Sequence, residues 1–240
     1  KLRRGGYDGK GNIVIKNKNE LDELISSDDG NWFLEKWVEF EKELALVVSR
    51  DSKGTVRSLP LVETHQINQI CEWVIAPANI PNSVETMAFN IAASLLEKIN
   101  YVGVLAIEFF YGPQGLQVNE IAPRAHNSAH YSIEACTSSQ FDQQLCITAN
   151  LPVPTPNLSV PGAFMVNLLG LEEGYKLSLD ERIKELSAYQ CFNLHWYGKE
   201  PELPGRKLGH ITILLQGQDS ESRRHEAFNH LKIIRAIWPN

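Results

Sequence analysis

The sequence has no long apolar run and no excess of positive charge, and each absence excludes a class of protein. No apolar stretch of the 240 residues reaches the roughly 18 needed to span a bilayer. The first residues, KLRRGGYDGKGN, contain no apolar signal core. We therefore expect a cytoplasmic protein with no membrane partner. The formal net charge of −6 gives no overall field that would attract nucleic acid, so we expect no nucleic-acid partner.

Paired-cysteine spacing and the P-loop motif are also missing. The four cysteines show no C-x-x-C spacing, and a chain of this size does not need disulfides, so we expect reduced thiols. The glycine-rich start does not fit G-x-x-x-x-G-K-[ST], which excludes a P-loop. The chain begins at Lys1 rather than Met, within a glycine-rich stretch that has the composition of a functional loop. We therefore expect further sequence upstream.

What the sequence does contain predicts an α+β fold. Strand-like patterns cover 12–16, 31–40, 42–50, 55–63, 70–77, 101–112, 113–124, 163–169, 187–194 and 204–214. Helical patterns cover 19–27, with Asn19 as a plausible N-cap, 83–99, 138–150 and 220–235. Turns are expected at DSKG, 51–54, and GPQG, 112–115. The apolar stripe of the helix at 83–99 predicts a core face formed by Val84, Met87, Ala88, Ile91 and Leu95.

The glycine-rich loop near the start is a candidate phosphate site. Glycines allow backbone N–H groups to turn inward and approach a phosphate, and basic side chains supply charge. The residues of these two kinds are Gly5, Gly6, Gly9 and Gly11, and Lys1, Arg3, Arg4 and Lys10. A hairpin turn with solvated basic residues explains the same pattern, so both readings stay open.

Two acids in consecutive apolar strands are a candidate metal site. Glu108 lies between Ile107 and Phe109, where a carboxylate is costly to bury unless it is paired or bound to a cation. Together with Glu120 in the next strand it would suit Mg²⁺, which takes a few carboxylates plus phosphate oxygens. The alternative is that Glu108 points outward from a half-exposed strand.

Two further clusters of residues each have a functional interpretation and a purely structural one. His126 and His130 have a spacing of four, but no cysteine or third histidine lies near them in sequence, so zinc is not favoured. Arg206 and Lys207 follow a glycine and could hold a phosphate as a fork and a point charge. A solvated turn explains the second cluster equally well.

Several stretches in order along the chain resemble the 5-(carboxyamino)imidazole ribonucleotide synthases, the ATP-grasp ATPase family of purine biosynthesis. They are RRGGYDGKGN, EKWVEFEKELALVVSR, YVGVLAIEFF, VNEIAPRAHNSAHYSIEACTSSQF and GRKLGH. The resemblance implies an ATP-grasp fold of two α+β subdomains around an ATP cleft, with a small C-terminal β-rich subdomain. It implies divisions at 1–50, 51–160 and 161–240, and the absence of the family's N-terminal domain.

The resemblance also implies an ATP and metal site. Its ATP-binding residues would be Lys1, Gly6, Tyr7, Asp8, Gly9, Lys10, Gly11, Asn12, Glu35, Lys36, Trp37, Val38, Glu43, Gln66, Asn119 and Glu120. Residues 35–38 would bind adenine and Glu43 the ribose. Glu108 and Glu120 would hold Mg²⁺ or Mn²⁺. Gln66 stands where the family often has a histidine, which leaves that ATP contact open.

The substrate site implied by the resemblance lies beside the ATP site. Its substrate-binding residues would be Tyr7, Asp8, Arg124, His126, Asn127, Ser128, Arg206 and Lys207, and its catalytic residues Lys1, Tyr7, Asp8 and Arg124. The implied reaction is carboxylation of aminoimidazole ribonucleotide with bicarbonate and ATP. The implied partners are a second copy in a homodimer and the aminoimidazole ribonucleotide mutase or carboxylase. Ala125 and Ala129 replace the family's usual Pro and Gly without removing a functional group.

Two other interpretations remain open from the sequence. One is another ATP-grasp carboxylate–amine ligase, such as the formate-dependent purine transformylase, which shares the scaffold and the paired acids but is not favoured by the HNS loop. The other is a fragment that binds the nucleotide without turning it over.

Overall fold

The α+β class predicted from the sequence is confirmed by the computed structural model, which describes residues 1–5, 11–27, 30–172 and 177–239. The described helices are α1 (Lys18–Ser27), α2 (Asn82–Lys98), α3 (Ser132–Ala135), α4 (Gln140–Thr148), α5 (Leu179–Ser187) and α6 (Ser220–Ile237), with a 3₁₀ turn at Asn127–Ala129. The described strands are β1 (Lys42–Arg50), β2 (Val56–Ser58), β3 (Val62–Ile67), β4 (Ile70–Ala76), β5 (Gly103–Gly112), β6 (Gly115–Ala122), β7 (Gly162–Leu169), β8 (Asn193–Trp196) and β9 (Lys207–Leu215).

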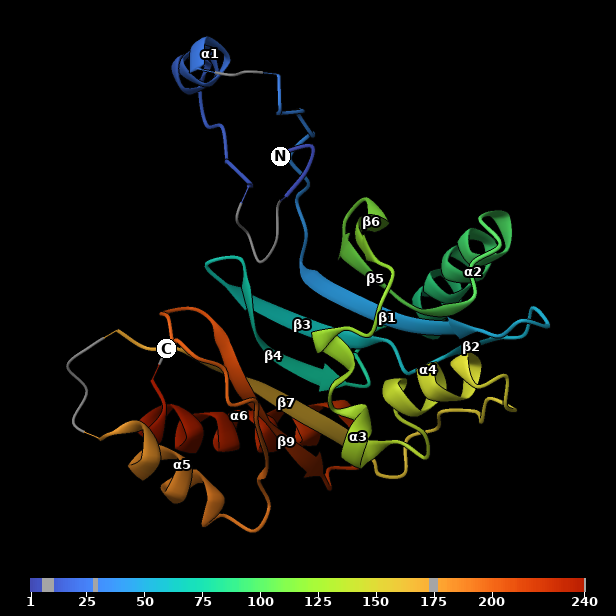
Figure 1. The fold of residues 1–240 in the computed structure, drawn as a ribbon, viewed down its shortest axis with the longest axis vertical. Coiled ribbons are helices and arrows are strands. Elements are labelled where there is room, and N and C mark those ends of the chain that lie inside the picture. Colours follow the sequence, from blue (N-terminus) through green and yellow to red (C-terminus); the bar gives the residue numbers. More distant parts are fainter. Residues whose placement is uncertain (6–10, 28–29, 173–176, 240) are drawn as a thin grey trace.

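These strands form one antiparallel sheet in the order β6-β5-β1-β3-β4-β7-β9-β8, with β2 paired to β1 (Figure 1). The predicted turns at 51–54 and 112–115 are both present, because β1 is followed by β2 and β5 pairs with β6. Pairing of β4 with β7 carries the sheet from the first strands into the C-terminal ones. The sheet therefore provides one continuous surface for side chains from distant parts of the sequence.

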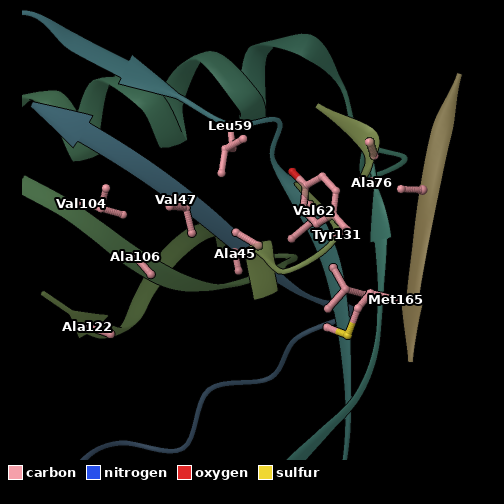
Figure 2. Close-up of a cluster of buried hydrophobic side chains, with 14 of the residues drawn as sticks. Ala45, Val47, Leu59, Val62, Ala76, Val104, Ala106, Ala122, Tyr131 and Met165 are labelled. Carbon is pink, nitrogen blue, oxygen red and sulfur yellow. The ribbon is translucent and has the colours of Figure 1, made fainter. Parts of the chain in front are cut away.

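Alternate side chains of the strands pack into different clusters, as the pleat of a sheet requires. On one face, α2 covers β1 and β5, while α5 and α6 cover β7 and β9. On the other face, segment 127–160 covers the centre, and Figure 2 shows Tyr131 of that segment among Val62, Ala45 and Met165 of the strands. We call this second face the loop face. Polar side chains lie on the loop face beyond the part that segment 127–160 covers.

Three predicted strands are wrong. Residues 12–16 and 31–40 have strand-like composition, but a strand needs a hydrogen-bonded neighbour, and the only bridge described there joins Leu2 to Trp32. Within 187–194, α5 reaches Ser187 and β8 begins only at Asn193. The predicted N-cap is also displaced, because the Asn17 side chain, rather than Asn19, accepts from the backbone N–H of Glu20.

The predicted core face of α2 is partly wrong. Its buried residues are Val84, Ala88, Ala92 and Leu96, whereas Met87 is 50% exposed. The buried residues repeat every four positions and include two alanines, whose small side chains let the helix approach the sheet closely. Residue size at the contact, rather than apolar character alone, therefore determines which face is buried.

None of the helices in the described ranges is both long enough and apolar enough to span a membrane.

Candidate functional site

Glu108 and Glu120 face each other across β5 and β6. They are register partners, and the ladder has an irregularity between Glu108 and Phe109 that leaves Asn119 as the extra residue of β6. Two like charges directly opposite each other in a sheet are destabilising unless a cation lies nearby. His126 Nε2 is 3.5 Å from Glu108 Oε1, and both side chains are largely covered, at 14% and 22% exposed. The outward-pointing alternative for Glu108 therefore does not fit.

The donor set at this pair fits Mg²⁺. Two carboxylates and the Asn119 amide supply hard oxygen ligands from adjacent positions, which is what Mg²⁺ takes when substrate phosphates complete its shell. In the ranges that the structure describes, no group of three or more His, Cys, Asp and Glu side chains is arranged to hold a metal ion. A site of this kind would thus depend on phosphate oxygens as well as on protein.

Lys1 connects the start of the chain to this pair of strands. Its Nζ lies 2.6 Å from Glu35 Oε2 and donates to Asn119 Oδ1 at 3.5 Å. Its backbone exchanges hydrogen bonds with Phe33, and the neighbouring bridge between Leu2 and Trp32 is antiparallel, so the two segments are held side by side. The structure therefore brings together three predicted ATP residues, Lys1, Glu35 and Asn119.

The segment predicted to bind adenine is mostly open. Glu35, Lys36 and Trp37 are exposed, Val38 is half-buried, and Trp37 is 68% exposed. Asn12 is exposed and Gly11 has a positive φ of 95°. Five predicted residues of the glycine-rich loop, Gly6, Tyr7, Asp8, Gly9 and Lys10, lie outside the described residues.

Glu43 and Gln66 lie together on the loop face. Burial raises the pKa of the Glu43 carboxyl, and a hydrogen bond from the backbone N–H of Gln66 acts in the opposite direction. Gln66 pairs in register with Cys71, whose thiol pKa burial raises to about 12. The charge of Lys207 acts against that rise, while Glu108 adds to it. Residues from β1, β3, β4, β5 and β9 therefore share one electrostatic environment.

The loop 126–128 is held by buried amides. The backbone N–H of His126 donates to Gln140 Oε1 at 2.7 Å, and Gln140 Nε2 donates back to the His126 carbonyl at 2.8 Å. His126 Nδ1 lies 2.9 Å from Ser128 Oγ. Asn127 and Asn167 exchange two amide hydrogen bonds, at 2.9 and 2.7 Å. The loop is therefore fixed from α4 on one side and from β7 on the other.

Two arginines predicted to bind substrate, Arg124 and Arg206, donate to backbone carbonyls. Arg124 Nη1 donates to the Ala125 carbonyl at 3.0 Å, and Arg206 Nη1 donates to the Pro201 carbonyl at 2.7 Å. Burial lowers the pKa of His130, and the charges of His126 and Lys207 act in the same direction. The structure therefore holds the loop 126–128 together, while the two guanidinium groups donate to carbonyls of nearby residues.

A histidine cluster behind the loop was missed by the sequence reading. His195 and His210, register partners in β8 and β9, stack with centroids 4.5 Å apart, and the His130 and His210 ring centroids are 5.0 Å apart. Tyr197 OH lies 2.7 Å from His210 Nδ1, and His195 Nε2 lies 2.5 Å from Glu134 Oε1. Burial, with smaller effects of neighbouring histidines, lowers the pKa of His210 to about 3. Burial likewise lowers the pKa of His130 to about 4.

Gln140 and Asn167 were also missed as residues that support the site. Asn167 carried a usable signal, because a polar residue between Val166 and Leu168 in an apolar strand is the pattern that drew attention to Glu108. Gln140 carried none, since an amide at the start of a helix is ordinary. Its importance depends on a contact with a loop fourteen residues away.

The chain matches two families of known proteins. Residues 1–141 match the ATP-grasp domain, and residues 163–224 match the phosphoribosylaminoimidazole carboxylase C-terminal domain. It is 47% identical to the N5-carboxyaminoimidazole ribonucleotide synthase of Synechococcus elongatus, over the whole of this chain and 61% of that protein.

Solved structures agree with these matches. One is an ADP complex of N5-carboxyaminoimidazole ribonucleotide synthetase, with a TM-score of 0.83 and 35% identity, covering 98% of this chain and 59% of that one. Another is the Aspergillus clavatus synthase with ADP and 5-aminoimidazole ribonucleotide, with a TM-score of 0.80 and 31% identity, covering 92% of this chain and 58% of that one.

The chain therefore spans about three fifths of the length of these relatives, in which 61%, 59% and 58% is covered. Both the order of the matched domains and the level of identity over the whole chain agree with the resemblance found in the sequence. The chain has the ATP-grasp fold and belongs to the N5-carboxyaminoimidazole ribonucleotide synthase family.

Proposed function

We propose that the protein catalyses ATP-dependent carboxylation of 5-aminoimidazole ribonucleotide with bicarbonate, forming 5-carboxyaminoimidazole ribonucleotide, ADP and phosphate in purine biosynthesis. The observation that carries this proposal is the contact between the loop and the acid pair, His126 Nε2 to Glu108 Oε1 at 3.5 Å. Two anionic substrates must meet in this reaction. A site with a metal-binding pair beside a rigid polar loop suits that meeting.

The proposed reaction has two steps. A bicarbonate oxygen attacks the γ-phosphorus of ATP and the bond to the β-phosphate oxygen breaks, which gives carboxyphosphate and ADP. The exocyclic amine of the ribonucleotide then attacks the carboxyl carbon, phosphate leaves, and the amine loses a proton to give the carbamate. Water must be excluded while the mixed anhydride exists.

On the nucleotide side, the proposal assigns charge neutralisation to Lys1 and positioning to the surrounding oxygens. Lys1 already contacts Glu35 and Asn119, so its ammonium lies between the adenine segment and β6. Glu108 and Glu120 would hold Mg²⁺ or Mn²⁺, which supplies electrostatic stabilisation of the transferring phosphoryl group when bound. Glu43 would accept hydrogen bonds from the ribose hydroxyls, and the adenine would lie against residues 35–38.

On the ribonucleotide side, the proposal assigns binding to the loop and to β9. His126, Asn127 and Ser128 would face the imidazole, and Arg206 and Lys207 the 5′-phosphate. This requires the Arg206 guanidinium to leave the Pro201 carbonyl, which is an exposed contact. Asp8 would orient the amine and accept its proton, with Tyr7 and Arg124 beside it.

The wider setting is part of the same proposal. We assign the chain to a homodimer that acts in the cytoplasm and passes its product to the aminoimidazole ribonucleotide mutase or carboxylase. The divisions at 1–50, 51–160 and 161–240 remain predicted subdomain limits. The boundary between residues 160 and 161 falls between α4 and β7, and the sheet continues across it.

The test is formation of ADP and of a ¹³C-labelled carbamate from [¹³C]bicarbonate, in the protein as its organism makes it. The proposal expects both products in equal amounts and only when the ribonucleotide is present. Formate consumption instead would favour the transformylase. ATP binding without turnover would favour a non-catalytic nucleotide-binding protein, and either result would overturn the proposal.

A further inference from the structure

We propose that Asn167, on β7, is a positioning residue that fixes the side-chain amide of Asn127 and thereby determines which groups the loop presents to the ribonucleotide. The inference rests on the proposed function for the identity of the ligand. Asn167 lies in the strand of the C-terminal family match, forty residues from its partner. It was not among the residues expected to bind anything.

The geometry of the pair is reciprocal. Asn127 Nδ2 donates to Asn167 Oδ1 at 2.9 Å, and Asn167 Nδ2 donates to Asn127 Oδ1 at 2.7 Å. Asn167 is fully buried, at 0% exposed, so water does not compete for these bonds. Two parallel bonds restrict rotation of the Asn127 amide about its last torsion, which a single bond would leave free.

The orientation of Asn167 is itself determined by the sheet. Its second N–H donates to the Cys71 carbonyl of β4 at 2.9 Å. A flipped Asn167 would place its Oδ1 against that carbonyl oxygen, two acceptors with no hydrogen between them. The Cys71 carbonyl therefore selects one orientation of Asn167, and Asn167 selects one orientation of Asn127.

Helix α6 supports the same arrangement from the other face. Arg235 donates to the Asn167 backbone carbonyl at 3.4 Å and to Glu72, next to Cys71, at 3.0 Å. The backbone positions that orient the Asn167 amide are thus held by a charged pair. This explains how an amide on a C-terminal strand can be held rigidly enough to position a loop.

The two bonds leave part of the Asn127 amide for a ligand. A primary amide has two N–H groups and two oxygen lone pairs, and the pair with Asn167 uses one of each. The second N–H and the second lone pair keep fixed directions on a half-buried loop next to His126. Fixed directions suit recognition of a ring that has both a donor and an acceptor edge.

The experiment compares Asn167→Ala, Asn127→Ala and the double variant, with Asn193→Ala as the matched control. Asn193 also donates from the same sheet to a backbone carbonyl, that of Thr212 on β9, at 3.1 Å, away from Asn127. We expect each single loop-pair variant to lower kcat/KM for the ribonucleotide about tenfold, the scale of one hydrogen bond, while KM for ATP changes less than about twofold.

The double variant separates positioning from general stability. If Asn167 acts through Asn127, the double variant loses no more than about the same tenfold, because the second change removes nothing further. Multiplicative losses, or an equal rise of both Michaelis constants, would overturn the inference. Asn167→Ser, which keeps a small polar side chain but lacks the amide that pairs with Asn127, is used if Asn167→Ala does not fold.

A readout independent of turnover tests the geometry itself. Side-chain ¹⁵N amide signals of Asn127 should show slow proton exchange in the parent and in Asn193→Ala, and fast exchange in Asn167→Ala. Unchanged exchange in Asn167→Ala would overturn the positioning claim. A parent protein without ribonucleotide-dependent turnover would overturn the proposed function instead, so the two failures can be told apart.

Discussion

The N-terminal arm, residues 1–41, and segment 119–141, which contains the loop 126–128, differ in how they are held. In the described part of the arm, α1 has no buried residue, and Leu34 and Trp37 are 67% and 68% exposed. Figure 1 shows α1 projecting well beyond the sheet. In segment 119–141, Ser128, Ser132 and Gln140 are buried polar residues whose hydrogen bonds hold the segment together internally. The two amide hydrogen bonds between Asn127 and Asn167 connect it to β7.

The difference indicates which half of the site is preformed. A buried amide that makes several hydrogen bonds is costly to disturb, so the loop keeps its shape without ligand. Large exposed apolar side chains, in contrast, indicate a surface that something else covers. Under the proposed function, the ribonucleotide side of the site would be built by the protein alone and nucleotide binding would complete the other side.

The largest effect is expected from loss of the proposed metal site, which would serve both substrates. Glu120→Gln should lower turnover by at least about 100-fold, since ligand loss should exceed the tenfold to hundredfold effect of residues that only support metal ligands. The fold should stay intact, because Glu120 is exposed. Steady-state ADP release measures the effect, with Glu97→Gln, another exposed acid, as control. Near-parental turnover would remove Glu120 from the metal site.

The second prediction concerns Asp8, to which the proposed function assigns orientation and deprotonation of the substrate amine. Asp8→Asn should lower carboxylation by on the order of 10², the scale of a lost general base, and leave ATP binding within a few fold. Single-turnover assays with saturating ATP and bicarbonate measure carbamate formation directly. An unchanged rate would exclude Asp8 as the general base.

Arg206→Ala should affect the two substrates unequally. We expect KM for the ribonucleotide to rise by about 10- to 100-fold, the worth of a charged hydrogen bond to phosphate, with little change in KM for ATP. Lys184→Ala, which removes an exposed positive charge on α5, is the control. Equal changes in both constants would place Arg206 outside the ribonucleotide site.

The free energy of unfolding tests the difference between the arm and the loop without any ligand. Gln140→Ala should lower the free energy of unfolding by about 1–3 kcal/mol, because the His126 N–H loses its acceptor in a buried place. Trp37→Ala should change it by less than about 0.5 kcal/mol, as expected at an exposed position. Urea unfolding of both variants checks this. Equal losses would mean that the arm is as firmly packed as the loop.

The last prediction concerns the pH dependence of the free energy of unfolding. The His210 pKa is lowered to about 3 in the fold, so between its ordinary value of 6.5 and about 3 the unfolded chain binds the extra proton. The contribution of neutral His210 to the free energy of unfolding is therefore fully present above pH 6.5, and it is lost as the pH falls toward 3. His210→Gln should flatten the decline by up to about 1.4 kcal/mol per pH unit in that window. An unchanged slope in urea titrations would mean that His210 protonates freely in the fold.

The sequence predicted the sheet better than the arm, for a physical reason. Strands such as β1 and β5 show themselves by apolar runs between turns, and both were located. Residues 12–16 and 31–40 have the same composition but no partner strand among the described residues, and pairing is not encoded locally. The acid pair was found because a carboxylate in an apolar strand is exceptional, whereas Gln140 acts only through a tertiary contact.

The most direct test of the central claim is amide hydrogen exchange with and without Mg²⁺·ADP. The account predicts that residues 126–141 are already protected without nucleotide and change little, while residues 30–41 gain protection when it is added. Protection of 126–141 that appears only with nucleotide, or an arm fully protected without it, would contradict the account.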